Sequence, residues 1–514
     1  MPPVFQPDEL PAGSSPGFED ETSSRGWVPL YRHGCSFGRD IFVDKMMNLI
    51  RNPNLNSSWL FRADILYDDD EDDEDKCLRK TGLSALVRHI PRSIREMETQ
   101  RTLVRTLIPR NQRRDKPLNQ TCTFHRGPTS DLVIYAAHVD SANELPFYHP
   151  AVRAVAHLHN WDPAVESGTI SILILPFDDE EEKENEKTIN LPTKVRRTAY
   201  HLLELLHKHG QSSAAGYVKR VHHDLIVPQA RLQNRYAALK DKYARRLVES
   251  WVESTDPLKH VFEDLAIAAF LIDLWTDMYD DDEDKFPGFV DIGCGNGLLV
   301  YILAQEGYRG WGFDARSRKS WSLFRPSAHL ERRLLLPSAV SRLDGDPTPR
   351  LLPDSDLHDG NFPPGTFIIS NHADELTAWT PILAAASDCP FIVIPCCSHN
   401  LAGDRFRAPP PTTSRNRLPH APPPSRSTYA SLVDWVARIA HDCGWFVETE
   451  MLRIPSTRNT CLIARRRLRS DERNDRGEEA LVDLDAVIAD YGGVQGYRTN
   501  LARLIHHTDT SQSH

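Results

Sequence analysis

The clearest pattern of apolar and polar positions lies between residues 286 and 321. An apolar run there ends at Asp291 and is followed at once by a glycine-rich turn. Apolar residues at helical spacing come next, and a second apolar run ends at Asp314. The pattern predicts a strand, a turn, a helix and a second strand that ends in an acid. This order is typical of half of a nucleotide-binding α/β unit, in which the acid can accept hydrogen bonds from ribose hydroxyls.

Three glycines stand at alternate positions of the turn: Gly293, Gly295 and Gly297. A dinucleotide site of the type G-x-G-x-x-G needs its third glycine at position 298, which is Leu298 here. With Asp291 two residues before the first glycine, the turn resembles the first motif of the Rossmann-like methyltransferases that use S-adenosylmethionine (SAM). The resemblance implies SAM as the co-substrate. The cofactor-binding residues that it implies are Asp291, Gly293, Cys294, Gly295, Asn296, Gly297, Asp314, Ala315, Ser370 and Asn371.

Several apolar runs of strand length precede residue 180. The predicted strands are Trp59 to Tyr67, Thr121 to His125, Asp131 to Ala137 and Thr169 to Phe177. Two helices are predicted near Arg79 to His89 and Ala151 to His159. Together these elements predict an α+β accessory domain over residues 26–177, after a disordered lead over residues 1–25. An acidic linker over residues 178–190 and a helical connector over residues 191–256 are predicted to follow.

Strands and helices alternate again over residues 257–467. The helix that opens at Asp256-Pro257 is apolar on most sides, which predicts burial against a sheet. Two apolar runs near the end of this region, Trp445 to Leu452 and Thr460 to Ala464, predict an antiparallel hairpin. The predicted fold class is therefore α/β, a Rossmann-like class I SAM-methyltransferase sheet with a terminal antiparallel hairpin, joined to the accessory domain. A flexible proline-rich insertion over residues 408–426 and a charged tail over residues 468–514 complete the prediction.

The distribution of charge along the chain bears on whether it binds nucleic acid. The 514 residues carry a formal net charge of -11, so the chain as a whole is not a basic nucleic-acid binder. Acids gather in runs, however, and a basic surface can coexist with them. The segment from Arg88 to Lys116 is rich in arginine. It predicts either a track for a phosphate backbone or a solvated helix and loop, and both interpretations stay open.

Nine cysteines are scattered along the chain, an odd number that does not suggest a disulfide framework. Reduced thiols are typical of proteins in reducing compartments. The first residues are acidic and rich in proline, unlike a secretion signal. The longest strongly apolar stretch, Leu265 to Ile272, is far shorter than the roughly 20 residues that cross a bilayer. The sequence therefore predicts a cytoplasmic protein with no membrane partner.

Polar side chains that can serve chemistry follow the strand that ends near Ser370. Open α/β sheets bind ligands beyond the carboxyl ends of their strands, so this is where a methyl acceptor should lie. The segment lacks the paired prolines that shape a slot for a base amine in amino-methyltransferases. It offers His372, Asp374 and Glu375 instead, groups suited to a hydroxyl nucleophile. For the two acids, capping of the following helix is an alternative role.

A second cluster, Cys396-Cys397-Ser398-His399, follows the next strand. Its spacing matches no four-ligand zinc site and no further Cys-x-x-Cys occurs, so no metal is predicted. A role for Cys396 as a methyl-accepting nucleophile is not favoured, because no general acid is evident beside it. The preferred interpretation is a pocket lining in which His399 faces the target. The candidate catalytic residues are thus Asp374, His372, Glu375 and His399.

Longer motifs resemble one family, the fungal and animal tRNA (uracil-2'-O)-methyltransferases. The segments that carry the resemblance are PFYHP, TDPLKHVFEDLAIAAFLIDLW, FVDIGCGNGLLVYILAQEGYRGWGFDARSRKSW, FIISNHADELTAW and IVIPCCSHN. The resemblance implies a cytoplasmic SAM-dependent enzyme of tRNA maturation that methylates the ribose of the uridine at position 44 of serine tRNA. It implies no catalytic base.

Two other functions remain as alternatives. A methyltransferase acting on protein, on a small molecule or on another RNA would use the same fold, since fold does not determine substrate. A tRNA enzyme should bind its substrate in a salt-dependent manner through the segment 88–116 and Arg465-Arg466-Arg467. The second alternative is a catalytically inactive SAM-binding subunit that holds a partner. Binding of SAM without turnover on tRNA would distinguish it.

Overall fold

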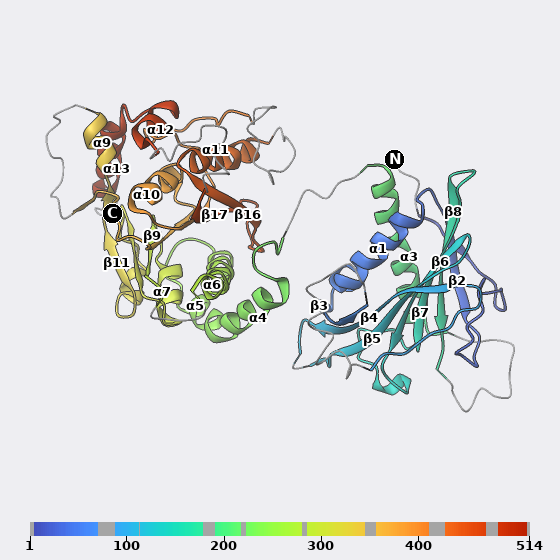
Figure 1. The fold of residues 1–514 in the computed structure, drawn as a ribbon. Helices are drawn as coiled ribbons and strands as arrows, with labels where there is room; N and C mark the ends of the chain where they lie inside the picture. Colours follow the sequence, from blue (N-terminus) through green and yellow to red (C-terminus); the bar gives the residue numbers. More distant parts are fainter. Residues whose placement is uncertain are drawn as a thin grey trace. The chain divides into compact units, whose positions relative to one another are not determined.

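The structure is a computed structural model of the chain. It describes residues 5–69, 88–112, 114–177, 191–216, 223–279, 285–344, 356–410, 427–468 and 482–510. The acidic linker, most of the helix expected near Arg79 to His89 and most of the proline-rich insertion lie outside these residues. The chain forms two compact units, residues 1–218 and 219–514, and each is described by itself (Figure 1).

The first unit is built on an eight-stranded antiparallel sheet with the order β1-β2-β8-β7-β6-β5-β4-β3 (Figure 1). Its strands are β1 (Asp8–Glu9), β2 (Val28–Cys35), β3 (Leu60–Asp68), β4 (Glu98–Pro109), β5 (Leu118–Arg126), β6 (Ser130–Ala137), β7 (Ala154–Asp162) and β8 (Ser167–Leu175). Four of them, β3, β5, β6 and β8, confirm the predicted strands. Two helices, α1 (Arg39–Arg51) and α3 (Thr193–Ala214), pack on one face of this sheet and enclose an apolar core with it.

The predicted helix over Ala151 to His159 is wrong, because this segment forms most of β7. The strand pairs with β6 on one side and β8 on the other. Its first six residues are all buried, since α1 and α3 cover one face of the sheet and Trp27 with Ile94 cover the other. Burial on both faces removes the alternation of apolar and polar residues by which a strand is recognised.

Two interpretations of the arginine-rich segment were open, a phosphate track or a solvated helix and loop, and much of the segment forms β4. Three of its arginines are engaged within the unit. Arg92 pairs with Asp20 at 2.7 Å, and Arg101 pairs with Asp68 at 2.7 Å. The buried Arg105 donates to the carbonyl oxygen of Ile50 at 2.6 Å and to Gln120. These three side chains therefore stabilise the unit and do not form a phosphate track.

The amino-terminal segment, predicted to be a disordered lead, packs on the sheet from residue 5 onward. Asp20 accepts hydrogen bonds from Trp27 Nε1 at 3.0 Å and from Arg92 at 2.7 Å. The side chains of Asp20 and Arg92 are 2% and 6% exposed. Composition alone did not reveal the segment because it is anchored by a few buried side chains among many polar ones.

Replacing Asp20 by alanine is expected to destabilise the first unit by about 3–5 kcal/mol, because Arg92 would remain buried without its partner. Scanning calorimetry of the full chain would measure the shift. Glu19→Ala is the matched control, since Glu19 and Arg95 form an exposed pair at 2.9 Å, which solvent screens, and a much smaller effect is expected. Equal effects of the two substitutions would contradict the anchoring role of Asp20.

The second unit is built on a seven-stranded sheet with the order β11-β10-β9-β14-β15-β17-β16. Its strands are β9 (Phe289–Ile292), β10 (Gly310–Asp314), β11 (His329–Arg332), β14 (Phe367–Asn371), β15 (Phe391–Ile394), β16 (Trp445–Met451) and β17 (Thr460–Arg467). A small sheet pairs β12 (Leu334–Leu335) with β13 (Leu357–His358). The first five strands of the large sheet pair in parallel, whereas β17 runs antiparallel to both β15 and β16.

Helices cover both faces of this sheet (Figure 1). One face carries α4 (Gln229–Leu239), α5 (Arg245–Glu249), α6 (Pro257–Tyr279) and α7 (Leu298–Gln305), with α8 (Trp321–Phe324) beside them. The other carries α9 (Ser338–Leu343), α10 (Thr380–Ser387), α11 (Thr428–Asp442), α12 (Leu484–Asp490) and α13 (Tyr497–Thr510). As its apolar pattern predicts, α6 is buried, and its Trp275 packs against Phe289 and Phe367. The predicted helical connector is divided, since α3 belongs to the first unit and α4 and α5 to the second.

The predicted charged tail contains α12 and α13, and Tyr497 of α13 docks on the unit. Its ring packs against Trp379 and its hydroxyl donates to the carbonyl oxygen of Leu335 at 2.8 Å. The basic run at the end of β17 is also engaged. Arg465 pairs with Glu448 at 2.5 Å, and Arg467 donates to the carbonyl oxygens of Cys443 and Ala385. In the described part of the chain, no helix is long and apolar enough to cross a membrane.

Candidate functional site

Four parallel strands of the second unit end at the same edge of the sheet, as their pairing in β10-β9-β14-β15 requires. Asp291 lies near the end of β9 and Asp314 at the end of β10. Asn371 is the last residue of β14, and Cys396 follows β15 by two residues. The fold thus brings together residues that are up to about a hundred positions apart in the sequence, which agrees with the rule that ligands bind beyond carboxyl strand ends.

The glycine turn after β9 has a left-handed backbone at each of its three glycines. Gly293, Gly295 and Gly297 have φ angles of 72°, 54° and 76°. A Cβ atom at Gly293 would lie 3.1 Å from Ala373, and one at Gly297 would lie 2.6 Å from Leu330. At Gly295 a Cβ atom would meet nothing within 4 Å. The outer two glycines allow close packing of the chain, and the middle one leaves open space above the turn.

Backbone N–H groups of the turn are used inside the protein. Those of Gly293 and Cys294 donate to the carbonyl oxygen of Phe313 at 2.8 and 3.0 Å. That of Gly295 donates to Asp314 at 3.0 Å, and the other carboxylate oxygen of Asp314 accepts from Arg316 at 2.9 Å. These bonds hold the carboxylate of Asp314 in place. Its remaining lone pairs can accept hydrogen bonds from ribose hydroxyls.

Two residues of the predicted cofactor set, Cys294 and Asn296, make side-chain contacts within the protein. The side chain of Cys294 is buried in the core, and a Cβ atom at Gly312 would lie 2.9 Å from its own Cβ. Burial raises the pKa of this thiol well above its usual range. Asn296 accepts a hydrogen bond from the backbone N–H of Leu298 at 2.8 Å, at the start of α7. Ala315 is half-buried beside Asp314.

Four neighbouring acids, Glu263, Asp264, Asp291 and Asp314, lie near the turn. Of these, the sequence motif indicated only Asp291 and Asp314. Asp291 is 2% exposed, and burial together with Asp264 and Asp314 raises its pKa well above the usual range. Burial and the neighbouring Glu263 raise the pKa of Asp264 to about 8. Asp291 Oδ1 has no hydrogen-bond partner among the residues that the structure describes. Such a group of carboxyls suits a cationic ligand, since a cation would favour their charged forms.

The pKa of Asp264 leads to a prediction about stability. Because this pKa is about 8 in the fold and about 3.9 in an unfolded chain, ionisation costs stability progressively as the pH rises from about 4 to about 8. Asp264→Asn is therefore expected to raise the melting temperature of the ligand-free chain by an amount that grows across this window and then levels off. Calorimetry at a series of pH values measures it. A difference in melting temperature that stays constant over this pH range would contradict the assignment.

His372 faces α6 and forms the best-defined polar pair of the acceptor edge. Its Nε2 lies 3.0 Å from Glu263 Oε1. Since a carboxylate only accepts hydrogen bonds, this contact places the ring proton on Nε2 and leaves Nδ1 as the acceptor. Nδ1 is buried and has no partner in the described part of the structure. The residue has a φ angle of 53°, so its ring is held by an uncommon left-handed backbone.

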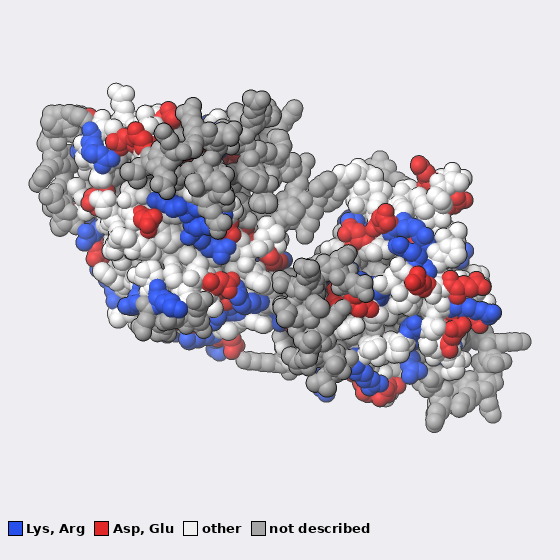
Figure 2. Space-filling view, viewed as in Figure 1, with Lys and Arg blue, Asp and Glu red and all other residues white. Residues whose placement is uncertain are grey.

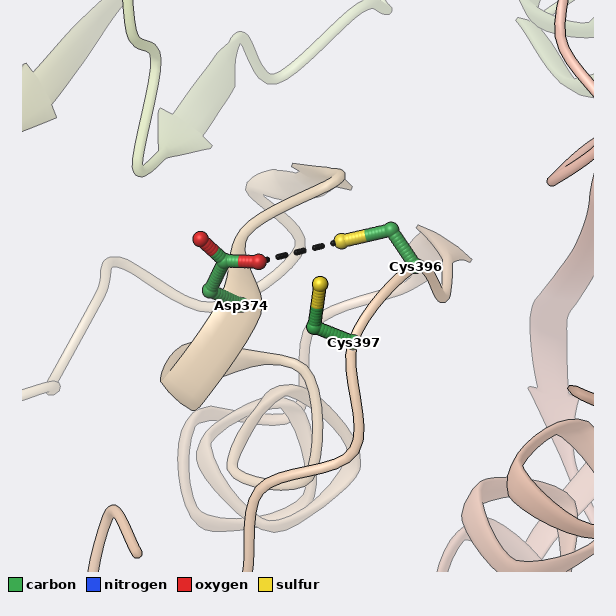
Figure 3. A group of neighbouring side chains, drawn as sticks. All are labelled: Asp374, Cys396 and Cys397. Atoms are coloured by element: carbon green, nitrogen blue, oxygen red, sulfur yellow. Dashed lines mark hydrogen bonds between the residues drawn. The ribbon is translucent and has the colours of Figure 1, made fainter. Parts of the chain in front are cut away.

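Asp374, Cys396 and Cys397 form a second cluster at this edge (Figure 3). Cys396 Sγ donates to Asp374 Oδ1 at 3.2 Å, and Cys397 lies beside them (Figure 3). One donor atom from each residue lies within 4.8 Å of the other two. Burial and the charge of Asp374 raise the pKa of Cys396. The arrangement can bind a cation, and a thiol held protonated in this way is a poor nucleophile.

The remaining predicted residues are near the same edge but make other contacts. Glu375 is close enough to Tyr497 of α13 to contribute, after burial, to the raised pKa of that phenol. His399 pairs through its backbone with Arg405, and its Nδ1 has no partner among the described residues. Ser370 is fully buried at the end of β14, and its hydroxyl likewise has no described partner, as is true of Asn371 Oδ1.

These features fit SAM. The ligand carries an adenosine, a sulfonium and an amino group, and the edge offers an acid for ribose, buried carboxyls for positive charge and open space over Gly295. The turn presents no free N–H groups at Gly293, Cys294 and Gly295 for a phosphate. Asp314 would hold the ribose, and Asp291 with Asp264 would face the cationic end. The unpartnered Asn371 Oδ1 offers one further acceptor.

Comparison with known proteins supports this assignment. Residues 6–220 match a family model described as TRM44-like, N-terminal bet v1-like domain, and residues 226–337 match one described as predicted AdoMet-dependent methyltransferase. A Neurospora crassa protein named tRNA (uracil-O(2)-)-methyltransferase is 50% identical over 100% of both chains. Proteins of the same name from Debaryomyces hansenii and Saccharomyces cerevisiae are 37% and 36% identical, over 94% and 85% of this chain and 96% and 86% of their own.

The chain belongs to the tRNA (uracil-O(2)-)-methyltransferase family. The family resemblance inferred from the sequence motifs is thereby confirmed. The bet v1-like model matches the first unit of this family member, and the methyltransferase model matches the part of the second unit that contains the glycine turn with β9, β10 and β11. A solved structure described as the pyocyanin biosynthetic protein PhzM covers 45% of this chain and 69% of its own at 14% identity, with a TM-score of only 0.18.

Sequence reasoning underestimated Glu263 and Asp264 of this family member. Both acids lie on a helix that is apolar on most sides and carries no motif of its own, a pattern that predicts burial against the sheet. The structure places Glu263 on His372 and Asp264 near Asp291. The available signal was two adjacent acids in the most apolar helix of the chain, because buried acids are uncommon unless they are paired or functional.

Proposed function

We propose that this protein transfers a methyl group from SAM to the 2'-hydroxyl of the uridine at position 44 of serine tRNA. The observation that carries the proposal is the match along the whole chain to relatives named tRNA (uracil-O(2)-)-methyltransferase. The acceptor edge supports it, since it offers a histidine and carboxylates suited to a hydroxyl rather than a slot for a base amine. The sheet order and the antiparallel β17 support a Rossmann-like class I methyltransferase fold.

In the proposed mechanism the protein positions two partners and accepts a proton. SAM supplies a methyl group on a positively charged sulfur. Asp314 holds the ribose of that ligand, and Asp264 and Asp291 favour its cationic end. His372 Nδ1 would accept the proton of the 2'-hydroxyl as its oxygen bonds to the methyl carbon and the bond from that carbon to sulfur breaks, which leaves S-adenosylhomocysteine with a neutral sulfur. Glu263 would fix the ring and stabilise the charged imidazole. Positioned proton acceptors of this kind contribute about 10²–10⁴-fold to the rate.

Asp374, Glu375 and His399 complete the proposed acceptor site. Asp374 is exposed and lies two residues after His372 in the same loop, so of the three it is the strongest candidate for contact with the acceptor hydroxyl. We propose that the first unit contributes to tRNA binding and that the protein acts in the cytoplasm. Figure 2 shows basic and acidic side chains interspersed on the visible face of each unit, so phosphate contacts there would come from small groups of basic residues.

Mass mapping of ribose methylation in serine tRNA, from cells with and without the gene, tests the proposal. The expected result is loss of one methylated uridine, restored by the purified protein with SAM. If cells without the gene lost methylation on a protein instead, the alternative of a protein methyltransferase would be favoured. Binding of SAM with no turnover on any tRNA would favour an inactive subunit that holds a partner. Salt dependence of tRNA binding gives an independent measurement.

A further inference from the structure

Three metal-binding side chains meet at the acceptor edge, although they come from two separate loops. Asp374 follows β14, and Cys396 and Cys397 follow β15 (Figure 3). The spacing along the sequence predicts no metal because it contains one cysteine pair and no second pair. The third donor is supplied by the neighbouring parallel strand, so only the folded chain shows the set of three.

The dimensions of this cluster suit a zinc ion. Zinc binds sulfur at about 2.3 Å and carboxylate oxygen at about 2.0–2.2 Å, so its tetrahedral ligands lie roughly 3.5–3.8 Å from one another. Cys396 Sγ lies 3.2 Å from Asp374 Oδ1, and all three donor atoms lie within 4.8 Å of each other. Small rotations of the side chains would therefore suffice for ligation, with no movement of the two strands.

The electrostatics of the cluster also favour a soft cation. The cluster combines two sulfur donors and one carboxylate oxygen. A divalent cation stabilises thiolates and a carboxylate together. Thiolate ligands select zinc over the hard cations magnesium and calcium.

We propose that Asp374, Cys396 and Cys397 bind a zinc ion whose fourth position is open. Sites with three protein ligands are typical of catalytic rather than structural zinc. The open position lies at the edge where the acceptor ribose approaches, so an oxygen ligand bound there would have a lowered pKa. This deepens the proposed function and rests on it: the ion would acidify the 2'-hydroxyl, and His372 would receive its proton. Binding of the ion releases the two thiol protons to solvent.

Metal analysis of the purified full-length chain tests the site without measuring methylation. The wild type, dialysed against zinc and then against metal-free buffer, is expected to retain about one zinc per chain. Cys396→Ser with Cys397→Ser, or Asp374→Asn, is expected to reduce the content at least tenfold. Ser398→Ala is the matched control from the same loop and should retain the ion. Substitution by Co²⁺ should give a thiolate charge-transfer band in the wild type that the cysteine variants lack.

A second measurement avoids the variants altogether, in case they fold poorly. Alkylation of the wild type, mapped by mass spectrometry, is expected to label the exposed Cys397 in metal-free protein and to spare it when zinc is bound. Apart from Cys396, the other described cysteines are buried and serve as an internal reference. Zinc that is not retained, or labelling that zinc leaves unchanged, would overturn the site.

The outcomes separate this inference from the proposed function. Zinc-free wild type that methylates tRNA at the full rate would overturn a catalytic ion and leave the proposed function standing. Protein that retains zinc on these residues but methylates no tRNA would confirm the site and overturn the proposed function. A disulfide between Cys396 and Cys397 in protein purified under reducing conditions would also contradict zinc binding.

Discussion

Replacing Gly295 by valine is expected to raise the dissociation constant for SAM about 100-fold or more. The φ angle of this residue is 54°, and its missing Cβ would point into open space above the turn, where we place the ligand. A branched side chain would fill that space and also strain the backbone by at least about 1–2 kcal/mol. A 100-fold loss corresponds to about 2.7 kcal/mol, which we assign to steric exclusion of the ligand, whereas the backbone strain lowers the stability of the fold.

Equilibrium dialysis with labelled SAM measures this effect, and calorimetry shows whether the variant is folded. Gly493→Val is the matched control, because Gly493 has a φ angle of 70° and equally open surroundings but lies between α12 and α13, outside the site. It should cost similar stability and leave SAM binding unchanged. Wild-type affinity in Gly295→Val would show that the turn does not form the SAM site.

The second large effect is expected from His372. Changing it to asparagine, which tolerates the left-handed backbone at this position, should lower the methylation rate about 10²–10³-fold and change the affinity for SAM less than about threefold. The reason is that asparagine cannot accept the proton from the ribose hydroxyl. Glu263→Gln should cause a smaller loss, since the imidazole remains but its charged form is no longer stabilised.

Single-turnover rates under saturating SAM measure these losses apart from binding. The control is His329→Ala, because His329 also lies within hydrogen-bond distance of a glutamate, Glu331 at 2.6 Å, but begins β11 at the opposite edge of the sheet. It should methylate like the wild type. A rate for His372→Asn within about threefold of the wild type would exclude this histidine as the proton acceptor. Asp374 and His399 would then be the remaining candidates for that role.

Most of the predicted strands agree with the structure, but β7 does not. The buried helix α6 and the hairpin of β16 and β17 agree with their sequence patterns. In contrast, β7 was taken for a helix because neighbouring elements bury both of its faces. The amino-terminal segment was missed for a different reason. Its order depends on Asp20 reaching Arg92, a contact 72 residues away that no local pattern contains.

The site divides in the same way. The methyl donor was determined by the sequence alone, because the alternate glycines, Asp291 and Asp314 lie within one strand-turn-helix-strand segment whose geometry is local. The acceptor chemistry was decided by the tertiary structure. Glu263 reaches His372 across 109 residues, and Asp374 reaches Cys396 across 22 residues from the end of the adjacent strand. Parallel pairing of β14 with β15 brings Asp374 close to Cys396, and the packing of α6 brings Glu263 close to His372. Neither contact can be inferred from the spacing of residues within a sequence motif.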